Sequence, residues 1–263
     1  MVGIAKHIYL VNILNNMLFS IITVTYNAAS VLPPTLKSVA EQSFRDFEYL
    51  VIDGASTDDT LKLVDNAGIT NTKVWSEPDK GLYDAMNKAI DRAEGDYLIF
   101  LNAGDTFATP ETLAQIALCA QEKPDVIYGQ TQLVDSDRNV VGMRHLIAPR
   151  ELDWKSFKNG MLVCHQAFIA KREIVPHYDM QYRFSADYDW CIKVLRKSGN
   201  NAYVGDQPII SFLNDGLTNK NHKKSLRERY RIMCQYYGTV PTTLRHLRFA
   251  LRHLSRKLQT PNS

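Results

Sequence analysis

Strand and helix patterns alternate at short intervals through the first half of this 263-residue chain, and this alternation limits the possible folds more than any other feature. Runs of apolar and β-branched residues predict buried strands, and a stretch with helical features follows each of them. The expected strands cover 19–25, 47–53, 72–78 and 97–103, and the expected helices cover 33–43, 57–66, 81–95 and 110–121. The alternation predicts an α/β domain with a mostly parallel central sheet flanked by helices.

The pattern changes after Asp125. The runs 126–134 and 139–145 predict a hairpin of shorter strands, and residues 188–197 predict a helix. His165 and Gln166, within LVCHQAF, are expected on a strand. In an open α/β sheet, ligands bind beyond the carboxyl ends of the strands. Asp53, Asp79 and Asp105 follow three of the expected strands, so this edge is the expected site.

Charge divides the chain into an acidic body and a basic tail. The chain holds 31 basic and 28 acidic side chains, and ten basic residues but only Glu228 among the acids lie from His222 onward. Residues 1–221 therefore carry 21 basic and 27 acidic side chains, a net charge of −6. Such a division suggests that the tail meets an anionic surface, either a membrane or a nucleic acid.

Leucines recur at helical spacing in this tail, with arginines mostly off the leucine stripe. A basic amphipathic helix of this kind suits anionic lipid headgroups, and a helix packed on the domain or on a partner is the alternative. No nucleic-acid-binding motif accompanies the charge, so we expect no nucleic-acid partner. The leucines of the stripe are Leu244, Leu247, Leu251, Leu254 and Leu258.

Five segments at the expected strand ends and helix starts form an ordered set: SIITVTYN (20–27), VIDGASTDDT (51–60), EPDKGLYDAMNKAI (77–90), YLIFLNAGD (97–105) and SADYDW (185–190). Together they resemble glycosyltransferase family 2, a family of inverting enzymes whose catalytic domain has the GT-A fold. The form of these segments is similar to the branch that builds capsule, exopolysaccharide or colanic-acid-type polymers. Each segment is weak alone, but the order and spacing of all five fit over about residues 17–215.

The resemblance implies a nucleotide-sugar donor, most often a UDP-sugar, bound by the first three segments. It assigns Thr25, Tyr26 and Asn27 to nucleotide contact and Asp53 to the N3–H of uracil, although a turn and a helix cap are the structural alternatives. Where the family has DDGS, this chain reads DGAS. Asp79 and Lys80 precede a helix whose free N–H groups suit an anionic ligand, and a solvated turn is the alternative.

The resemblance also implies a divalent metal, Mn²⁺ or Mg²⁺, on Asp105. Such cations take oxygen ligands from carboxylates and substrate phosphates. The family has an Asp-rich cluster here, but this chain reads NAGD, so Asn102 offers only an amide oxygen. Helix capping is the alternative for Asp105. Asn102, His165 and Gln166 are assigned to the diphosphate or the acceptor, with a core role for His165 as the alternative.

Asp187 matches the family's general base, which takes the proton of the acceptor hydroxyl. Capping of the following helix is its structural alternative. We expect residues 1–16 to be an N-terminal extension, 17–221 the GT-A catalytic domain and 222–263 the basic helical tail. The acceptor implied by the resemblance and the tail is a lipid-linked saccharide in bacterial surface polysaccharide synthesis.

Other functions fit the sequence less well. No GxGxxG follows the first strand, which disfavours a dehydrogenase, and no glycine-rich basic loop marks a nucleotidyltransferase. A catalytically lapsed subunit that binds sugar nucleotides or scaffolds a complex stays an alternative, because the NAGD motif is reduced. Widely spaced cysteines and the lack of a long apolar run indicate a cytoplasmic protein, with a peripheral place on the inner face of the membrane as an open alternative.

Overall fold

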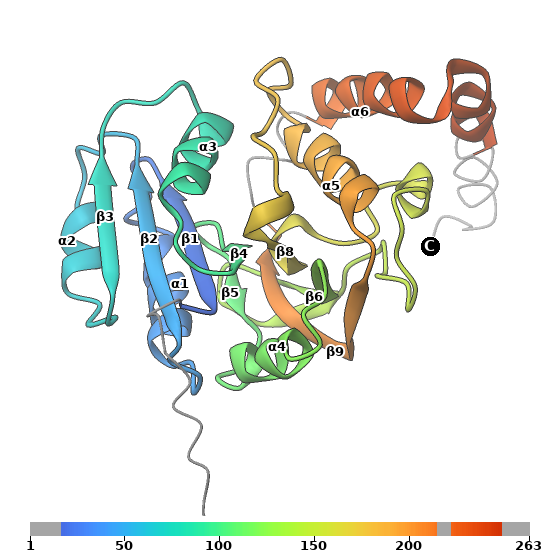
Figure 1. Cartoon of the computed structure of the whole chain (residues 1–263). Coiled ribbons are helices and arrows are strands. Elements are labelled where there is room, and N and C mark those ends of the chain that lie inside the picture. The colour runs from blue at the N-terminus through green and yellow to red at the C-terminus, as the bar shows by residue number, and fades with distance from the viewer. Residues whose placement is uncertain (1–16, 215–221, 249–263) are drawn as a thin grey trace, which may run out of the picture.

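The computed structural model describes residues 17–214 and 222–248. Its first half is a three-layer arrangement in which parallel strands carry helices on both faces (Figure 1). Pro33 and Pro34 occupy the first turn of the first helix, where a missing N–H costs nothing. The elements are β1 (Phe19–Thr25), α1 (Leu32–Ala40), β2 (Phe47–Asp53), α2 (Thr60–Asp65), β3 (Thr72–Ser76), α3 (Leu82–Arg92) and β4 (Tyr97–Phe100).

The second half adds strands of both directions to the same sheet. The nine-stranded sheet has the order β3-β2-β1-β4-β8-β6-β9-β5, and β7 pairs with β6. The sheet is therefore parallel from β3 to β4 and mixed beyond β4. These elements are β5 (Thr106–Phe107), α4 (Thr112–Ala120), β6 (Val126–Val134), β7 (Val140–Met143), η1 (Ser156–Asn159), η2 (His165–Ala167), β8 (Phe168–Lys171), η3 (Arg172–Ile174), α5 (Ala186–Lys197), β9 (Asn201–Leu213) and α6 (His222–Tyr237).

The expected strand at His165 and Gln166 is wrong. These residues form the 3₁₀ turn η2, because the N–H of Ala167 bonds to the carbonyl of Cys164 and the N–H of Phe168 bonds to that of His165. The strand β8 begins only at Phe168. The turn buries both neighbouring side chains, whereas a strand would send them to opposite faces.

Three parallel strands end together at one edge of the sheet. The register pairs Thr25 at the end of β1 with Asp53 at the end of β2, and pairs Asp53 with Ser76 at the end of β3. Both β1 and β2 are buried along their whole length, so the sheet fixes where their polar ends emerge. Of the three acids that the sequence places at strand ends, Asp53 lies in this row, and Asp79 and Asp105 follow the ends of β3 and β4 in the chain.

The described part of the basic tail packs on the domain. α6 lies beside α5, on the far side of the molecule from β3 and α2 (Figure 1), and Ile232 and Met233 on α6 are buried. Residues 239–248 are also helical. Leu244 and Leu247 are exposed, and the other leucines of the predicted stripe lie outside the described residues. Within the described ranges, no helix has the length and apolar character needed to cross a bilayer.

Candidate active site

Asp53 lies at the end of β2 and is fully buried. Its Oδ1 accepts hydrogen bonds from the hydroxyls of Thr25 (2.9 Å) and Ser56 (2.5 Å). Its Oδ2 accepts from the N–H of Ser56 (2.8 Å) and the hydroxyl of Ser76 (2.7 Å). Burial alone would raise the pKa of Asp53, but these bonds hold it below its usual value. Because a carboxylate has about four acceptor positions, a uracil N3–H would have to displace a protein donor.

Asp79 presents a second carboxylate beside Gly54, next to Asp53 in the chain. A Cβ at Gly54 would lie 2.5 Å from Oδ2 of Asp79 and 3.3 Å from the ring of Tyr26, so only glycine allows this approach. Oδ1 of Asp79 accepts the N–H of Gly81 at 2.7 Å. Among the residues described, none donates a hydrogen bond to Oδ2. Tyr26 is 67% exposed, so the ring and this oxygen form an open polar and aromatic platform.

Asn27 shapes the loop that carries this platform. It adopts a left-handed conformation (φ 47°), which asparagine tolerates better than most residues. Its Oδ1 accepts the N–H of Thr57 at 2.9 Å, and its own N–H donates to the hydroxyl of Ser56 at 2.8 Å. Thr25 and Asn27 thus join the loop after β1 to the loop after β2, and Tyr26 between them is exposed.

Two acids bind the backbone just before α3, although no side chain caps the first turn of the helix itself. Gly81 supplies the left-handed conformation (φ 111°) at which the helix begins. Asp79 accepts the N–H of Gly81, and Asp84 accepts the N–H of Lys80 at 3.0 Å. The bound N–H groups precede the helix, and the two nearby carboxylates disfavour a phosphate at this end of α3. The side chain of Lys80 is exposed.

Asp105 is buried behind β5, with 5% of its surface exposed. Its Oδ1 accepts the N–H of Leu213 at 2.9 Å, and its Oδ2 accepts the side-chain amide of Gln166 at 2.7 Å. Burial raises the pKa of Asp105 to about 7, against the effect of these bonds and of the Arg138 charge. The Arg138 guanidinium donates to the carbonyl of Gly104 at 2.6 Å.

A divalent cation at this loop would find two protein donors. Oδ1 of Asn102 is buried without a hydrogen-bond partner, which is the state expected of an oxygen reserved for a further ligand. Asp105 supplies the carboxylate. Over the described ranges, no group of three His, Cys, Asp or Glu side chains gathers to hold a metal. The pair Asn102 and Asp105 therefore fits a cation only if substrate phosphates complete its coordination.

Asp187 lies in the first turn of α5 and is partly exposed. Its Oδ1 accepts the hydroxyl of Tyr83 at 3.1 Å and the N–H of Tyr188 at 2.9 Å. Burial and the Asp187 charge hold the pKa of Tyr83 well above its usual value, so the phenol stays protonated and donates. These two bonds fix one carboxylate oxygen. Oδ2 has no donor among the described residues.

Aromatic rings form a rigid layer beneath Asp187. Tyr83 stacks on Tyr178 with ring centroids 5.4 Å apart, and Tyr178 stacks on Trp190 at 5.1 Å. His165 shares a 2.5 Å hydrogen bond with the hydroxyl of Tyr178. Burial lowers the pKa of His165 to about 4, against the effect of the Asp187 charge. His165 is therefore a satisfied core residue behind the site, the alternative that the sequence left open.

Asp189, two residues along α5, is buried and engaged elsewhere. Its Oδ1 accepts the hydroxyl of Tyr236 at 2.7 Å, and its Oδ2 lies 2.7 Å from Nζ of Lys193. With both oxygens held by partners on α5 and α6, Asp189 is a structural residue. Asp187 is the more accessible acid of the two.

The turn η2 connects the two ends of the site. Gln166 bonds to Asp105, while the charge of Asp187 acts on neighbouring His165. The sequence did not predict that Tyr83 contacts Asp187 or that Arg138 acts on Asp105. Tyr83 lies inside the quoted GLYDAMNK segment, which was a usable signal, whereas Arg138 in a hairpin turn looked like any solvated charge.

Comparison with known proteins identifies the family of this site. Residues 20–178 match the family described as glycosyl transferase family 2. A PGL/p-HBAD biosynthesis glycosyltransferase of Mycobacterium bovis is 36% identical over 185 residues, which are 67% of this chain and 69% of that protein. The Escherichia coli protein WfgD is 24% identical over 72% of this chain and 74% of the WfgD chain. It is named a UDP-Glc:α-D-GlcNAc-diphosphoundecaprenol β-1,3-glucosyltransferase.

A solved structure shows the same fold. Residues 1–349 of TarS from S. aureus, in complex with UDP-GlcNAc, superpose with a TM-score of 0.67 at 20% identity, covering 91% of this chain and 73% of that one. The expected GT-A architecture is thereby confirmed. Since the family match spans more than half of the chain and includes the loops of Asp53, Asp79 and Asp105, the protein belongs to glycosyltransferase family 2.

Proposed function

We propose that this glycosyltransferase moves a sugar from a UDP-sugar to a hydroxyl of a lipid-linked saccharide, with inversion at the anomeric carbon. Asp187 carries the proposal, because it is a partly exposed carboxylate with one oxygen fixed by Tyr83 and the other without a protein donor. The solved TarS complex contains UDP-GlcNAc, and the name of WfgD includes a UDP-sugar and a diphosphoundecaprenol-linked acceptor. Both support the substrate classes.

The donor base lies on the platform of Tyr26 and Asp79. The exposed ring of Tyr26 offers a stacking surface, and Oδ2 of Asp79 is an acceptor for the N3–H of uracil. Asp53 acts beneath them as a positioning residue, since its four bonds join β1, β2 and β3. Thr25 and Asn27 contribute by holding the loop, and exposed Lys80 is placed beside it.

In the transfer step, Oδ2 of Asp187 accepts the proton of the acceptor hydroxyl. The hydroxyl oxygen attacks the anomeric carbon as the bond from that carbon to the diphosphate oxygen breaks on the opposite face, and UDP leaves. Tyr83 stays protonated and orients the carboxylate. A Mn²⁺ or Mg²⁺ ion on Asn102 and Asp105 would act as a Lewis acid that offsets charge on the diphosphate. Gln166 holds the Asp105 side chain in place.

The experiment that tests this function is Asp187→Asn. The amide keeps the size of the side chain but cannot accept a proton, so the transfer rate should fall by about 10² to 10⁴ while UDP affinity stays unchanged. The measurement is sugar transfer to a lipid-linked acceptor, alongside UDP binding by the same folded variant. Asp189→Asn is the contrasting variant, which should lower stability more than chemistry because Asp189 is buried.

A lapsed, sugar-nucleotide-binding subunit is the second candidate. The observation in its favour is the buried Asp105, with both oxygens bonded to protein donors and no second acid nearby in the motif. A lapsed subunit would bind UDP and show the same transfer rate, at background level, for the natural chain and for Asp187→Asn.

A further inference from the structure

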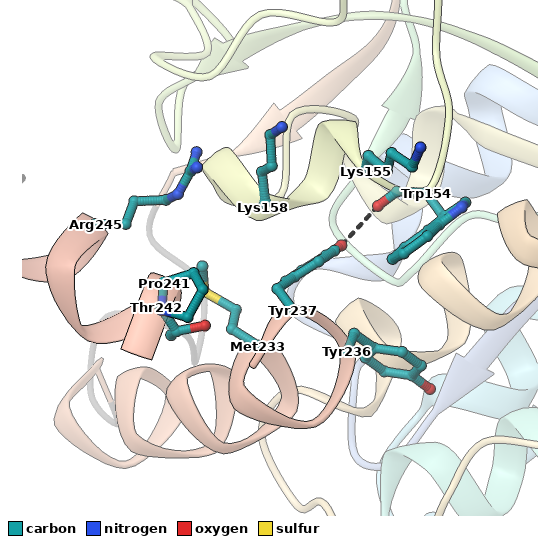
Figure 2. A pocket seen from close by; sticks show the side chains of 9 residues that line it. All are labelled: Trp154, Lys155, Lys158, Met233, Tyr236, Tyr237, Pro241, Thr242 and Arg245. Atoms are coloured by element: carbon teal, nitrogen blue, oxygen red, sulfur yellow. Dashed lines mark hydrogen bonds between the residues drawn. The ribbon is translucent and has the colours of Figure 1, made fainter. Parts of the chain in front are cut away.

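A pocket lies between α6, the helical residues 239–248 and the turn η1, and none of the acids of the candidate site lines it (Figure 2). Its volume is about 380 Å³. Three cationic side chains line it, Lys155, Lys158 and Arg245. Their charged ends lie along one side of the pocket, and Met233, Pro241 and Thr242 lie along the other (Figure 2).

The cations of this pocket have no carboxylate partner within the described part of the chain. Lys155 and Lys158 enter no ion pair there, and Arg245 bonds only to the amide oxygen of Asn159. The ends of Lys155 and of nearby Arg196 lie 5.9 Å and 5.5 Å from the centroid of the Trp154 ring. Several unneutralised positive charges around one cavity favour an anionic group of a ligand.

Thr242 gives an independent indication of a ligand. The residue is 1% exposed and lines the pocket, yet its hydroxyl is buried without a hydrogen-bond partner. A buried hydroxyl without a partner costs about 1–3 kcal/mol, so native proteins seldom keep one without a reason. A ligand with its own hydrogen-bonding oxygen would supply the missing partner.

The aromatic wall of the pocket is formed in advance. Trp154 and Tyr237 stack with ring centroids 5.6 Å apart and planes at 5°, and the hydroxyl of Tyr237 donates to the carbonyl of Trp154 at 2.6 Å. Phe157 in η1 accepts the hydroxyl of Tyr188, the residue after Asp187, at 2.5 Å. These contacts hold one wall of the pocket together and connect η1 to the helix that carries the proposed base.

An exposed apolar stripe beside the pocket identifies the source of the anion. Val240, Leu244 and Leu247 are 70%, 62% and 56% exposed, and their spacing places them on one face of the helix. Arg245 on the same helix lines the pocket. Apolar side chains that face water next to a cationic cavity fit an anionic membrane lipid better than a free anion.

We propose that this pocket binds the phosphate headgroup of an anionic bilayer lipid. The phosphate lies among Lys155, Lys158 and Arg245, an ester or hydroxyl oxygen of the headgroup bonds to Thr242, and the stripe Val240, Leu244 and Leu247 enters the apolar layer. This site goes beyond the transfer reaction, because it makes no use of the donor platform. It holds the α5 side of the domain at the surface where a lipid-linked acceptor would be.

Vesicle binding by charge-matched variants of the full chain tests the pocket. Vesicles of phosphatidylcholine alone and vesicles that also contain phosphatidylglycerol are sedimented with the protein. The double variant Lys155→Gln and Lys158→Gln should bind the anionic vesicles roughly thirtyfold more weakly. The control, Lys37→Gln with Lys123→Gln, loses the same charge on distant exposed helix ends and should bind as the natural chain does. Equal weakening in both would mean diffuse attraction and overturn the pocket.

Thr242→Val provides a variant whose folding is not at risk. It keeps the branched shape and removes the unpartnered hydroxyl, so stability should stay equal or rise. Binding of monomeric short-chain phosphatidylglycerol, measured by the change in tryptophan fluorescence, should weaken. Unchanged binding would contradict the role of Thr242. Displacement of that lipid by inorganic phosphate at similar concentration would indicate a free-anion site and overturn the lipid assignment. UDP-induced stabilisation, measured in every variant, reports separately on the donor site.

Discussion

Two carboxylates near the donor platform have opposite surroundings although their residues lie close together. Asp53 is buried and accepts four hydrogen bonds from protein donors, while Asp79 keeps one oxygen open beside the exposed ring of Tyr26. A carboxylate that already accepts hydrogen bonds from protein donors at all its positions holds loops together. A carboxylate with an oxygen that lacks a protein donor can accept a hydrogen bond from a ligand. At the residue scale, the proposed recognition of the base by Asp79 is therefore separated from the positioning of the loops by Asp53.

We expect Asp79→Asn to weaken UDP binding by about tenfold to a hundredfold and to reduce the preference for UDP over CDP. A charged acceptor contributes about 1.5–3 kcal/mol to such a hydrogen bond, and cytosine offers an acceptor at N3 where uracil has its N–H donor. Isothermal calorimetry with both nucleotides measures the change. Asp53→Asn serves as the contrast. Its amide N–H groups would face the donors that now bond to the Asp53 carboxylate, so this change should lower the free energy of unfolding. A stable Asp53→Asn protein that alone lost the preference for uracil would return base recognition to Asp53.

Acid sensitivity is expected from His165. Its pKa is about 4 in the fold and 6.5 when exposed, so between these values the unfolded chain binds the extra proton. The stability that this residue contributes is fully present above pH 6.5 and is lost as the pH falls towards 4. The free energy of unfolding decreases by at most about 3 kcal/mol over this range. Urea unfolding at about pH 7.5 and about pH 5 should show a smaller loss in His165→Gln. His145→Gln, at an exposed position, should keep the full loss.

At the scale of elements, α6 holds the loop that leads to the proposed base. Glu228 on α6 accepts the N–H groups of Arg183 and Phe184 at 3.0 and 2.8 Å, and Ser225 lies 3.0 Å from the hydroxyl of Ser185. These contacts fix the backbone just before Asp187. The basic tail is therefore, in its described part, a support for α5.

Glu228→Gln should lower the turnover rate about tenfold with little change in UDP affinity. One amide nitrogen replaces an accepting oxygen, so one of the two loop N–H groups loses its partner and the Asp187 loop loosens. Steady-state kinetics should show the loss in kcat more than in the KM for the donor. Glu122→Gln, an exposed change at the end of α4, is the control. A fall in UDP affinity equal to the fall in kcat would contradict a role limited to positioning.

The sequence predicted regular elements better than the links between them. Apolar runs marked β1, β2 and β6 because buried strands must be apolar along their length. The turn η2 was missed, since hydrogen bonds from Ala167 and Phe168 form it and an apolar run does not distinguish a turn from a strand. The hydrogen bonds to Asp53 could not be predicted either, because Ser56 lies in the loop after β2 whereas Ser76 ends the separate strand β3.

At the scale of the whole molecule, the two halves of the sheet supply different acids of the candidate site, and Tyr83 on α3 contacts Asp187 on α5. The parallel half carries Asp53 and Asp79, whereas α5, from the mixed half, carries Asp187. The order of the five sequence segments could predict this gathering only through a family resemblance, because pairings such as Tyr83 with Asp187 span 104 residues. Ligands that bind only the folded chain should stabilise the molecule as a whole.

The last prediction concerns that stabilisation and its dependence on metal. UDP at a concentration about a hundredfold above its Kd should stabilise the fold by about 2.7 kcal/mol and raise the Tm by several degrees, and Mn²⁺ should add a further increment. Asp105→Asn should keep the increment from UDP and lose the increment from Mn²⁺. Asn102→Asp places a carboxylate at the oxygen that now lacks a partner, so its Mn²⁺ increment should exceed that of the natural chain. Differential scanning fluorimetry with and without EDTA measures each increment. A full Mn²⁺ increment in folded Asp105→Asn, with none gained in Asn102→Asp, would place the cation away from this loop.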